Sequence, residues 1–164
     1  MREAEKKILT RDALAEECRR LRAAGKKVVF TNGCFDLMHA GHAGYLQFAR
    51  QQGDVLVVGL NTDASVRRHK GPLRPIVDEQ NRARMMAALE CVDYVTWFDE
   101  DEPKELIGEL QPDVLVKAED WAHYVSGRDI VEARGGKVVL APMVEGLSTT
   151  RLIEKIVQAY GAEK

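Results

Sequence analysis

The chain has 164 residues, of which 45% are hydrophobic and 30% charged, and its formal net charge is −2. This length and composition are those of one folded domain, so a disordered chain is excluded. The near-neutral charge lacks the basic footprint of a nucleic-acid-binding protein, and no apolar run approaches the roughly 20 residues of a membrane span. Neither nucleic acid nor a membrane is expected as a partner.

The three cysteines, Cys18, Cys34 and Cys91, are odd in number and show no Cys-x-x-Cys spacing. This pattern argues against a disulfide framework and against a zinc site. The first twelve residues lack the apolar stretch of a secretory signal. We therefore expect a protein of the reducing cytoplasm with no metal site of its own.

The predicted elements begin with a helix over residues 10–24, where apolar side chains recur at helical spacing and a glycine follows. The apolar run at 26–33 predicts a buried strand, and 43–52 predicts a second helix. Residues 69–77 contain two prolines and a glycine and predict a loop. The remaining elements alternate: strands are predicted at 54–61, 93–98, 112–117 and 137–142, and helices at 79–90, 99–110, 126–134 and 148–160.

Short apolar strands that alternate with helices are typical of a parallel sheet covered on both faces. We expect an α/β fold, a Rossmann-like, doubly wound sheet of five parallel strands, with residues 1–25 as an N-terminal helical extension and 26–164 as the main domain. Ligands of such sheets bind beyond the carboxyl ends of the strands. The residues that directly follow each strand are therefore the candidate site residues.

His39 and His42 follow the first strand and are three residues apart, so they share one face of a first helical turn. A helix N-terminus binds anions, imidazoles can donate to phosphate oxygens, and Gly41 leaves room for a close approach. The pair is alternatively a helix-surface coincidence or half of a metal site. The metal alternative is weak because His69 and His123 are isolated.

The stretch 67–74 follows the second strand and contains four cations and a histidine. It is either a solvated basic loop or a mobile flap that closes over a triphosphate, and Arg82 on the next helix either joins it or is solvated. After the fourth strand, Asp120 is placed to accept from a ribose hydroxyl, while Trp121 packs near a base or in the core. Before the last helix, the hydroxyl residues 148–150 form either a simple N-cap or a second phosphate cradle.

Two motifs resemble signatures of a known superfamily. Residues 32–42, Asn-Gly-Cys-Phe-Asp-Leu-Met-His-Ala-Gly-His, resemble the HxGH signature of the cytidylyltransferase-like nucleotidyltransferases, and 145–150, Glu-Gly-Leu-Ser-Thr-Thr, resemble their ISTT-type signature. Within the superfamily, the chain is most similar to the adenylyltransferase domain of bacterial ADP-heptose synthesis. The segments that carry this similarity are 60–77, 88–95, 113–117 and 135–156.

The resemblance implies a role for each matching residue. His39 and His42 would be catalytic contacts of the triphosphate, and Lys70 would bridge ATP and the sugar phosphate. Asp36 would orient the acceptor phosphate, with Arg74 also on the substrate. The residues implied in nucleotide binding are Asn32, Gly33, Cys34, Phe35, Gly41, His42, Arg82, Lys117, Asp120, Trp121, Ser148, Thr149 and Thr150.

The function implied by the resemblance is adenylyl transfer from ATP, with Mg²⁺ bound through the phosphates, to D-glycero-β-D-manno-heptose 1-phosphate, in a homodimer. Met143-Val144 replaces the Arg-Thr pair of glycerol-phosphate cytidylyltransferases, which favours ATP over CTP, whereas Ala118-Glu119 replaces a glycine common in the heptose enzymes. The alternatives are a cytidylyltransferase for glycerol or ethanolamine phosphate, an FAD synthetase, or a non-catalytic nucleotide-binding regulator.

Overall fold

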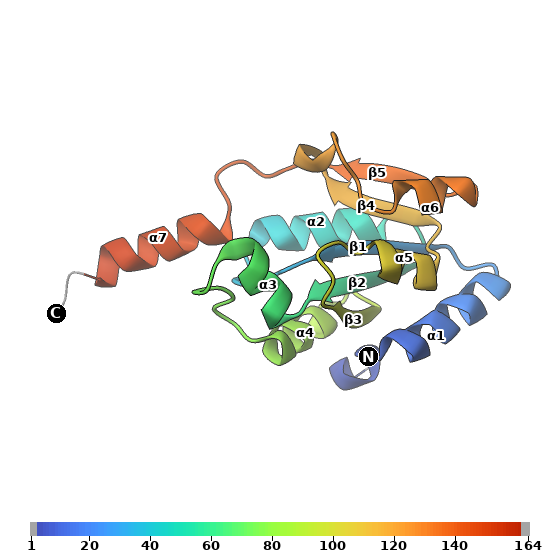
Figure 1. Ribbon diagram of the computed structural model, residues 1–164, viewed down its shortest axis with the longest axis horizontal. Coiled ribbons are helices and arrows are strands. Elements are labelled where there is room, and N and C mark those ends of the chain that lie inside the picture. Colours follow the sequence, from blue (N-terminus) through green and yellow to red (C-terminus); the bar gives the residue numbers. More distant parts are fainter. Residues whose placement is uncertain (1–2, 162–164) are drawn as a thin grey trace.

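The computed structural model describes residues 3–161, and its centre is one sheet of five strands (Figure 1). All pairings between neighbouring strands are parallel, and the order across the sheet is β3-β2-β1-β4-β5. This confirms the expected Rossmann-like α/β fold. The strands are β1 Val28–Gly33, β2 Val55–Asn61, β3 Tyr94–Phe98, β4 Val114–Ala118 and β5 Lys137–Ala141.

Seven α-helices and two short 3₁₀ helices join these strands in residues 3–161. The predicted loop from residue 69 is wrong at its start, because His69 and Lys70 end a helix. Thr62 caps that helix by accepting from the Ser65 amide, and Gly71 ends it with a φ of 95°. The helices are η1 Ala4–Lys7, α1 Arg11–Ala23, α2 Ala40–Arg50, α3 Asp63–Lys70, α4 Glu79–Ala88, α5 Lys104–Leu110, η2 Glu119–Trp121, α6 Arg128–Ala133 and α7 Thr149–Tyr160.

Helices cover both faces of the sheet, as expected for buried parallel strands. α1, α5 and α6 pack on one face, where Leu14, Cys18 and Leu106 are fully buried. α2 and α4 pack on the other face, where Leu46 and Met86 are fully buried. α1 thus shares its core with the sheet, and the division of the chain at residue 25 stays a prediction.

The helix predicted over 99–110 starts only at Lys104, and the acidic stretch 99–102 before it is not helical. Its carboxylates bind side chains of other elements instead. Glu100 pairs with Arg11 of α1, and Asp101 pairs with Arg68 of α3. The stretch therefore ties α1 and α3 to the end of β3.

Aspartates at the amino edge of the sheet satisfy amides of neighbouring strands. Asp113, just before β4, accepts from the Val28 amide at 2.8 Å, and Asp93, just before β3, accepts from the Leu56 amide at 2.9 Å. Val28 begins β1 and Leu56 is the second residue of β2, so each carboxylate pairs a strand amide close to the amino edge. These contacts fix the strand starts at the edge opposite the site.

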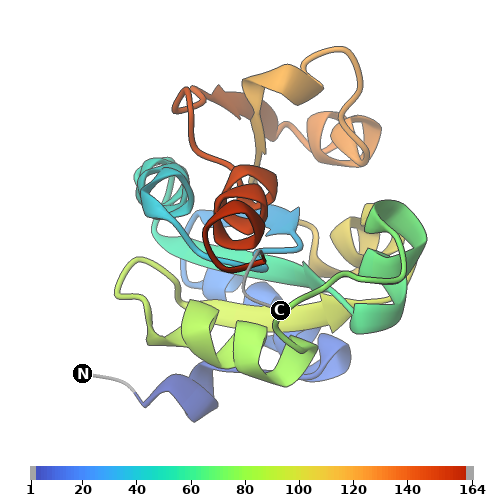
Figure 2. The ribbon, with the colours of Figure 1, turned by 90° about the vertical axis from the view of Figure 1, so that its left-hand side faces the viewer.

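At the carboxyl edge, the strand order reverses between β1 and β4, which creates the crevice where ligands of such sheets bind. The N-termini of α2 and α7 lie at this edge, and α7 then projects away from the sheet (Figure 1). Figure 2 turns this end toward the viewer and shows α7 nearly end-on. None of the α7 residues is buried. Among residues 3–161, no helix is long and apolar enough to cross a membrane.

Candidate active site

A cavity of about 670 Å³ lies at the carboxyl edge of the sheet, over the switch point. Its walls are the turn after β1, the first turn of α2, the end of α3, the end of β4 with η2, and the segment that leads into α7. All but one of the site residues predicted from the sequence line it. They are Asn32, Gly33, Cys34, Phe35, Asp36, His39, Gly41, His42, Lys70, Arg74, Lys117, Asp120, Trp121, Ser148, Thr149 and Thr150.

His39 and His42 lie at the start of α2 with their rings stacked, the ring centroids 3.8 Å apart. The backbone N–H of His39 donates to Nδ1 of His42 at 3.3 Å, which caps the helix. A neutral imidazole whose Nδ1 accepts carries its proton on Nε2. The local backbone thus makes Nε2 of His42 the hydrogen-bond donor.

The electrostatics of the pair favour this neutral form. Burial lowers the pKa of His42 to about 4, with a smaller contribution from neighbouring His39. Burial also lowers the pKa of His39. Nδ1 of His39 is buried and has no hydrogen-bond partner within residues 3–161. Near neutral pH the site therefore presents uncharged imidazoles, and Nδ1 of His39 is enclosed beside Gly41.

Gly41 is required by the histidine pair itself rather than by a ligand alone. A Cβ at position 41 would lie 2.9 Å from Nδ1 of His39 and 3.5 Å from Cβ of Leu147. The first distance is shorter than real Cβ contacts, so any side chain would displace the His39 ring. The observed position of the His39 ring therefore requires a glycine at position 41.

Lys117 at the end of β4 reaches across the switch point to β1. Its Nζ donates to Oδ1 of Asn32 at 3.1 Å and lies 5.4 Å from the centroid of the Trp121 ring. Burial lowers the pKa of Lys117 to about 8, although nearby Asp120 opposes the shift. A mostly desolvated ammonium at this point attracts an anion more strongly than a solvated one would.

The start of α7 supplies the second helix N-terminus of the cavity. Ser148 accepts from the Arg151 amide at 3.1 Å and is the predicted N-cap. The Thr149 hydroxyl donates to the Leu37 carbonyl at 3.1 Å and so links α7 to the turn that precedes α2. Thr150 lines the cavity. Two helix N-termini thus face one space, the arrangement that favours a polyphosphate.

The role of Asp36 toward the acceptor phosphate stays a prediction, and the structure shows that its carboxylate is already satisfied within the protein. Its side chain is only 1% exposed. Its oxygens accept from the amides of Ile76 and Val77 and from Nε of Arg74. Burial alone would raise the pKa of Asp36, but these hydrogen bonds and the Arg74 charge lower it overall. Asp36 therefore orients the protein segment around Arg74 and makes no direct contact with a phosphate in this arrangement.

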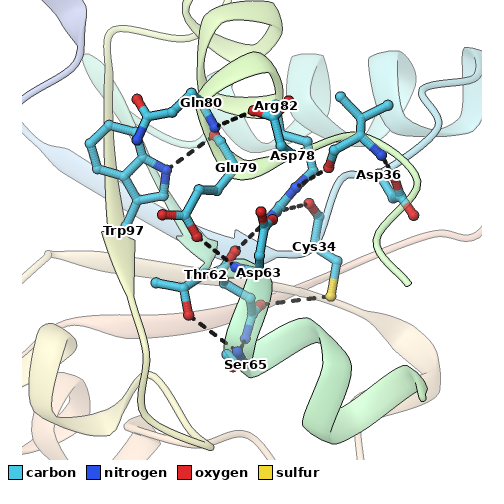
Figure 3. A network of polar contacts seen from close by, with 12 residues as sticks. Cys34, Asp36, Thr62, Asp63, Ser65, Asp78, Glu79, Gln80, Arg82 and Trp97 are labelled. Atoms are coloured by element: carbon cyan, nitrogen blue, oxygen red, sulfur yellow. Dashed lines mark hydrogen bonds and ion pairs between the residues drawn. The ribbon is translucent and has the colours of Figure 1, made fainter. Parts of the chain in front are cut away.

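Arg82 is the one predicted site residue that does not line the cavity, which corrects its expected place on the phosphates. Its side chain is fully buried and donates to the carbonyls of Cys34, Asn61 and Val77 (Figure 3). It also pairs with Asp63 at 2.8 Å. With these acceptors engaged, the guanidinium holds strand ends together and cannot reach a ligand.

The basic stretch 67–74 is only partly a flap over the cavity. Arg68 of α3 pairs with Asp99 and with Asp101, and the second of these carboxylates lines the cavity. Lys70, at the C-terminus of α3, and Arg74 line the cavity. The two cations that line it were predicted correctly, but most of the stretch is ordered helix.

Several lining residues were missed by reasoning from the sequence. Tyr45 lies in the helix predicted over 43–52 and was not predicted as a site residue, yet its hydroxyl bonds Thr31 at 2.6 Å and donates to the Val116 carbonyl at 3.1 Å. Tyr124 and Ser126 line the wall between β4 and α6 and both donate to Glu102. No motif in the sequence indicates this wall, because the wall depends on how the segment after η2 folds.

Taken together, the cavity offers neutral imidazole donors, two helix N-termini, two lysines and an arginine. Such donors neutralise phosphate charge and stabilise charge that develops during phosphoryl or nucleotidyl transfer. Within the described part of the chain, no group of three metal-ligating side chains is found. The geometry therefore suits chemistry on a nucleoside triphosphate.

Comparison with known proteins decides the family. The model of the cytidylyltransferase-like family matches residues 30–155, well over half of the chain. The chain belongs to the cytidylyltransferase-like family. The resemblance drawn from the HxGH and ISTT-type motifs is confirmed at this level.

Curated relatives within the cytidylyltransferase-like family are close in sequence. The bifunctional protein HldE of Trichlorobacter lovleyi is 54% identical over 164 residues, and that of Citrifermentans bemidjiense is 56% identical over 160 residues. The matches cover 99% and 97% of this chain and 33% of each relative. The chain thus spans about a third of the length of these relatives.

Two solved structures share the fold of this chain. A lipopolysaccharide core biosynthesis protein from Thermoplasma volcanium superposes with a TM-score of 0.60 at 28% identity, covering 73% of this chain and 98% of that one. Pantothenate synthetase from Thermus thermophilus gives a TM-score of 0.55 at 19% identity, covering 89% and 67% of the two chains. At that identity the second likeness concerns the fold alone.

Proposed function

We propose that the protein transfers the adenylyl group of ATP to D-glycero-β-D-manno-heptose 1-phosphate and gives ADP-heptose and pyrophosphate. The observation that carries this proposal is the single cavity that gathers the two histidines, Lys70, Lys117 and the hydroxyls of α7 over the switch point. Support for the sugar comes from the similarity to heptose adenylyltransferase domains and from the lipopolysaccharide core protein of similar fold.

In the proposed reaction, an oxygen of the sugar phosphate attacks the α-phosphorus of ATP. The bond from that phosphorus to the bridging oxygen breaks, and pyrophosphate leaves with the electron pair. A phosphate monoester is already anionic, so a strong general base is not required. The protein positions the reactants and neutralises charge: Nε2–H of His42 donates to the reacting phosphate, and Lys70 bridges the two substrates.

Mg²⁺ enters the proposal as part of the substrate MgATP. The donor set fits this assignment, because no three metal-ligating side chains cluster in residues 3–161 and the phosphate oxygens must supply most ligands. When bound, the ion neutralises phosphate charge. The residues of the chain act on the phosphates themselves.

The test is a panel of ATP and CTP against heptose 1-phosphate, glycerol 3-phosphate, ethanolamine phosphate and FMN, with pyrophosphate release as the readout. We expect turnover with ATP and heptose 1-phosphate. His42→Ala is the matched inactive variant, with kcat lowered by about 10²–10³-fold through loss of one preorganised donor. Turnover with CTP and none with ATP would instead favour the cytidylyltransferase, and ATP binding without turnover would favour the regulator.

Two further proposals concern the setting of the enzyme. The resemblance supports a homodimer, which the molar mass in solution tests directly by light scattering. The three cysteines are free thiols in the structure, which supports the reducing cytoplasm as the compartment.

A further inference from the structure

One peptide segment beside the cavity is held from both sides by buried charges. The amide of Val77 donates to Oδ1 of Asp36 at 2.9 Å, and its carbonyl accepts from Nε of Arg82 at 3.0 Å. The Ile76 amide donates to the same carboxylate at 2.9 Å. Both charged side chains are almost completely inaccessible to solvent. We call the contacts of Asp36 and Arg82 with Val77 the Val77 clamp.

The clamp is anchored to the sheet, not to a flexible loop. Asp36 lies in the turn after β1, and Arg82 donates to the carbonyl of Cys34 in the same turn at 2.7 Å. Arg82 also donates to the carbonyl of Asn61, the last residue of β2, at 2.8 Å (Figure 3). The position of Val77 is therefore set relative to the carboxyl edge that carries the cavity.

The clamp has a direct consequence for Arg74. Nε of Arg74 donates to Oδ2 of Asp36 at 2.7 Å, which fixes one edge of the guanidinium. Arg74 lines the cavity, and its side chain is 15% exposed. A guanidinium bound through Nε keeps its two Nη groups in a fixed plane, the geometry that suits a phosphate. Burying an ion pair costs desolvation, so the pair needs a reason beyond stability.

We propose that Asp36 and Arg82 are positioning residues, which hold the segment 74–77 so that the Nη groups of Arg74 meet the phosphate of the acceptor. The proposal rests on the proposed function, because the acceptor is a sugar phosphate only if that function is correct. Neither positioning residue touches substrate. Their effect reaches the reaction through Arg74 and should fall on the acceptor rather than on ATP.

The kinetic test uses Asp36→Asn, Arg74→Lys and the double variant. Asparagine keeps the shape of the Asp36 side chain but carries no charge. Its NH₂ group would also face one of the N–H donors from which the carboxylate accepts. We expect each single variant to raise KM for the sugar phosphate about tenfold, as loss of one charge-assisted hydrogen bond does, with KM for ATP within twofold. Because both act through one contact, the double variant should be no worse than the more severe single one.

Glu109→Gln is the matched control, since Glu109 also binds an arginine, Arg11, but outside the cavity. We expect its KM values to equal those of the wild type. A rise of both KM values together in Asp36→Asn, with a loss of thermal stability, would show a merely structural role and overturn the proposal. If Asp36→Asn does not fold, Arg74→Lys gives the decision, because it leaves the Val77 clamp intact and must still raise KM for the acceptor alone.

A second readout does not depend on activity. Hydrogen exchange of the Ile76 and Val77 amides should be at least about tenfold faster in Asp36→Asn, while exchange in β1 and β2 is unchanged. If the wild type fails to use heptose 1-phosphate, the proposed function fails, yet this exchange still decides whether the clamp exists. Unchanged exchange of both amides would refute the clamp whatever the substrate is.

Discussion

At the scale of single residues, Gly41 shows how one missing side chain sets catalytic geometry. We expect Gly41→Ala to lower kcat about 10- to 100-fold, because the added methyl group would lie 2.9 Å from Nδ1 of His39 and displace the ring. Thermal stability should stay equal or rise slightly, because alanine favours the helix over glycine. Measured together, activity should therefore fall while the melting temperature does not.

Gly44→Ala is the control for this substitution. Gly44 lies in the same helix, and an added Cβ there meets nothing within 4 Å. Its kcat should remain that of the wild type. Equal kcat values in Gly41→Ala and the wild type would mean that the position of the His39 ring does not matter for transfer.

Lys117 gives the site a pH dependence on the alkaline side. Its pKa of about 8 means that the ammonium is charged at pH 7 and loses its proton as the pH rises through 8. We expect the Kd for ATP to increase above that pH by up to about tenfold per unit, until the anion no longer gains from this charge. Isothermal titration between pH 6.5 and 9.5 measures the effect.

Lys117→Arg separates this residue from other titrating groups, since arginine stays protonated over the whole range. Its Kd for ATP should be flat with pH, even if its absolute affinity differs. A wild-type Kd that does not change up to pH 9.5 would exclude Lys117 as an anion ligand. The acid side should show no step from His42 until well below pH 6, because burial keeps its pKa at about 4.

Residue roles were the part of the site that the sequence predicted least well. The location of the site residues could be predicted from motifs, because residues that follow parallel strands meet at one edge of the sheet. Arg82 was misassigned because three of its acceptors are backbone carbonyls, which leave no trace in a sequence. Asp36 was assigned to the acceptor phosphate by the family resemblance, and nothing in the sequence shows that its carboxylate accepts from the Ile76 and Val77 amides. Spacing cannot show whether a charge is already paired.

At the scale of elements, the strands could be predicted within about two residues because each is a short run rich in apolar residues and bounded by polar turns. The helix α3 was not predicted, because its cations at 67–70 suggested a loop. The capping residue Thr62 was present as a signal, and Gly71 marked the end. The capping residues therefore indicated a helix in a segment whose basic composition suggested a loop.

Asp113 tests how the elements are held at the edge away from the site. Asp113→Ala removes the acceptor of the Val28 amide, which is bonded at 2.8 Å, and leaves a partly buried donor unsatisfied. We expect a loss of about 1–3 kcal/mol in the free energy of unfolding, measured with urea, and unchanged KM values. A change in KM without a loss of stability would contradict this separation of scaffold from site.

At the scale of the whole molecule, the net charge of −2 gives no sign of the cations that line the cavity. Lys70, Arg74 and Lys117 line the cavity. Four carboxylates line it as well, and two of them are paired, Asp36 with Arg74 and Asp101 with Arg68; the four are those of Asp36, Asp101, Glu102 and Asp120. The cations of the site are balanced by neighbouring carboxylates, so the overall composition contains no sign of the site. That nucleic acid is not a partner stays an expectation from the composition.

Removal of the projecting helix α7 should abolish the proposed activity and leave the stability of the molecule nearly unchanged. None of its residues is buried, and its hydrogen bond to the rest of the fold is that of Thr149 with the Leu37 carbonyl. We expect a chain that ends at residue 147 to melt within about 2 °C of the full chain, as for a change confined to the surface. It should nevertheless lose transfer activity, because Ser148, Thr149 and Thr150 are removed.

A chain that ends at residue 154 is the matched variant, because it keeps the three hydroxyl residues and removes the remaining two turns of α7. Its melting temperature should equal that of the shorter chain, and its activity should be recovered in part, limited by fraying of the short helix. A large fall in melting temperature for both chains would instead mean that the exposed apolar side chains Ile156, Val157 and Tyr160 are buried in solution. Light scattering of the full chain would then distinguish burial against a second copy from burial against its own sheet.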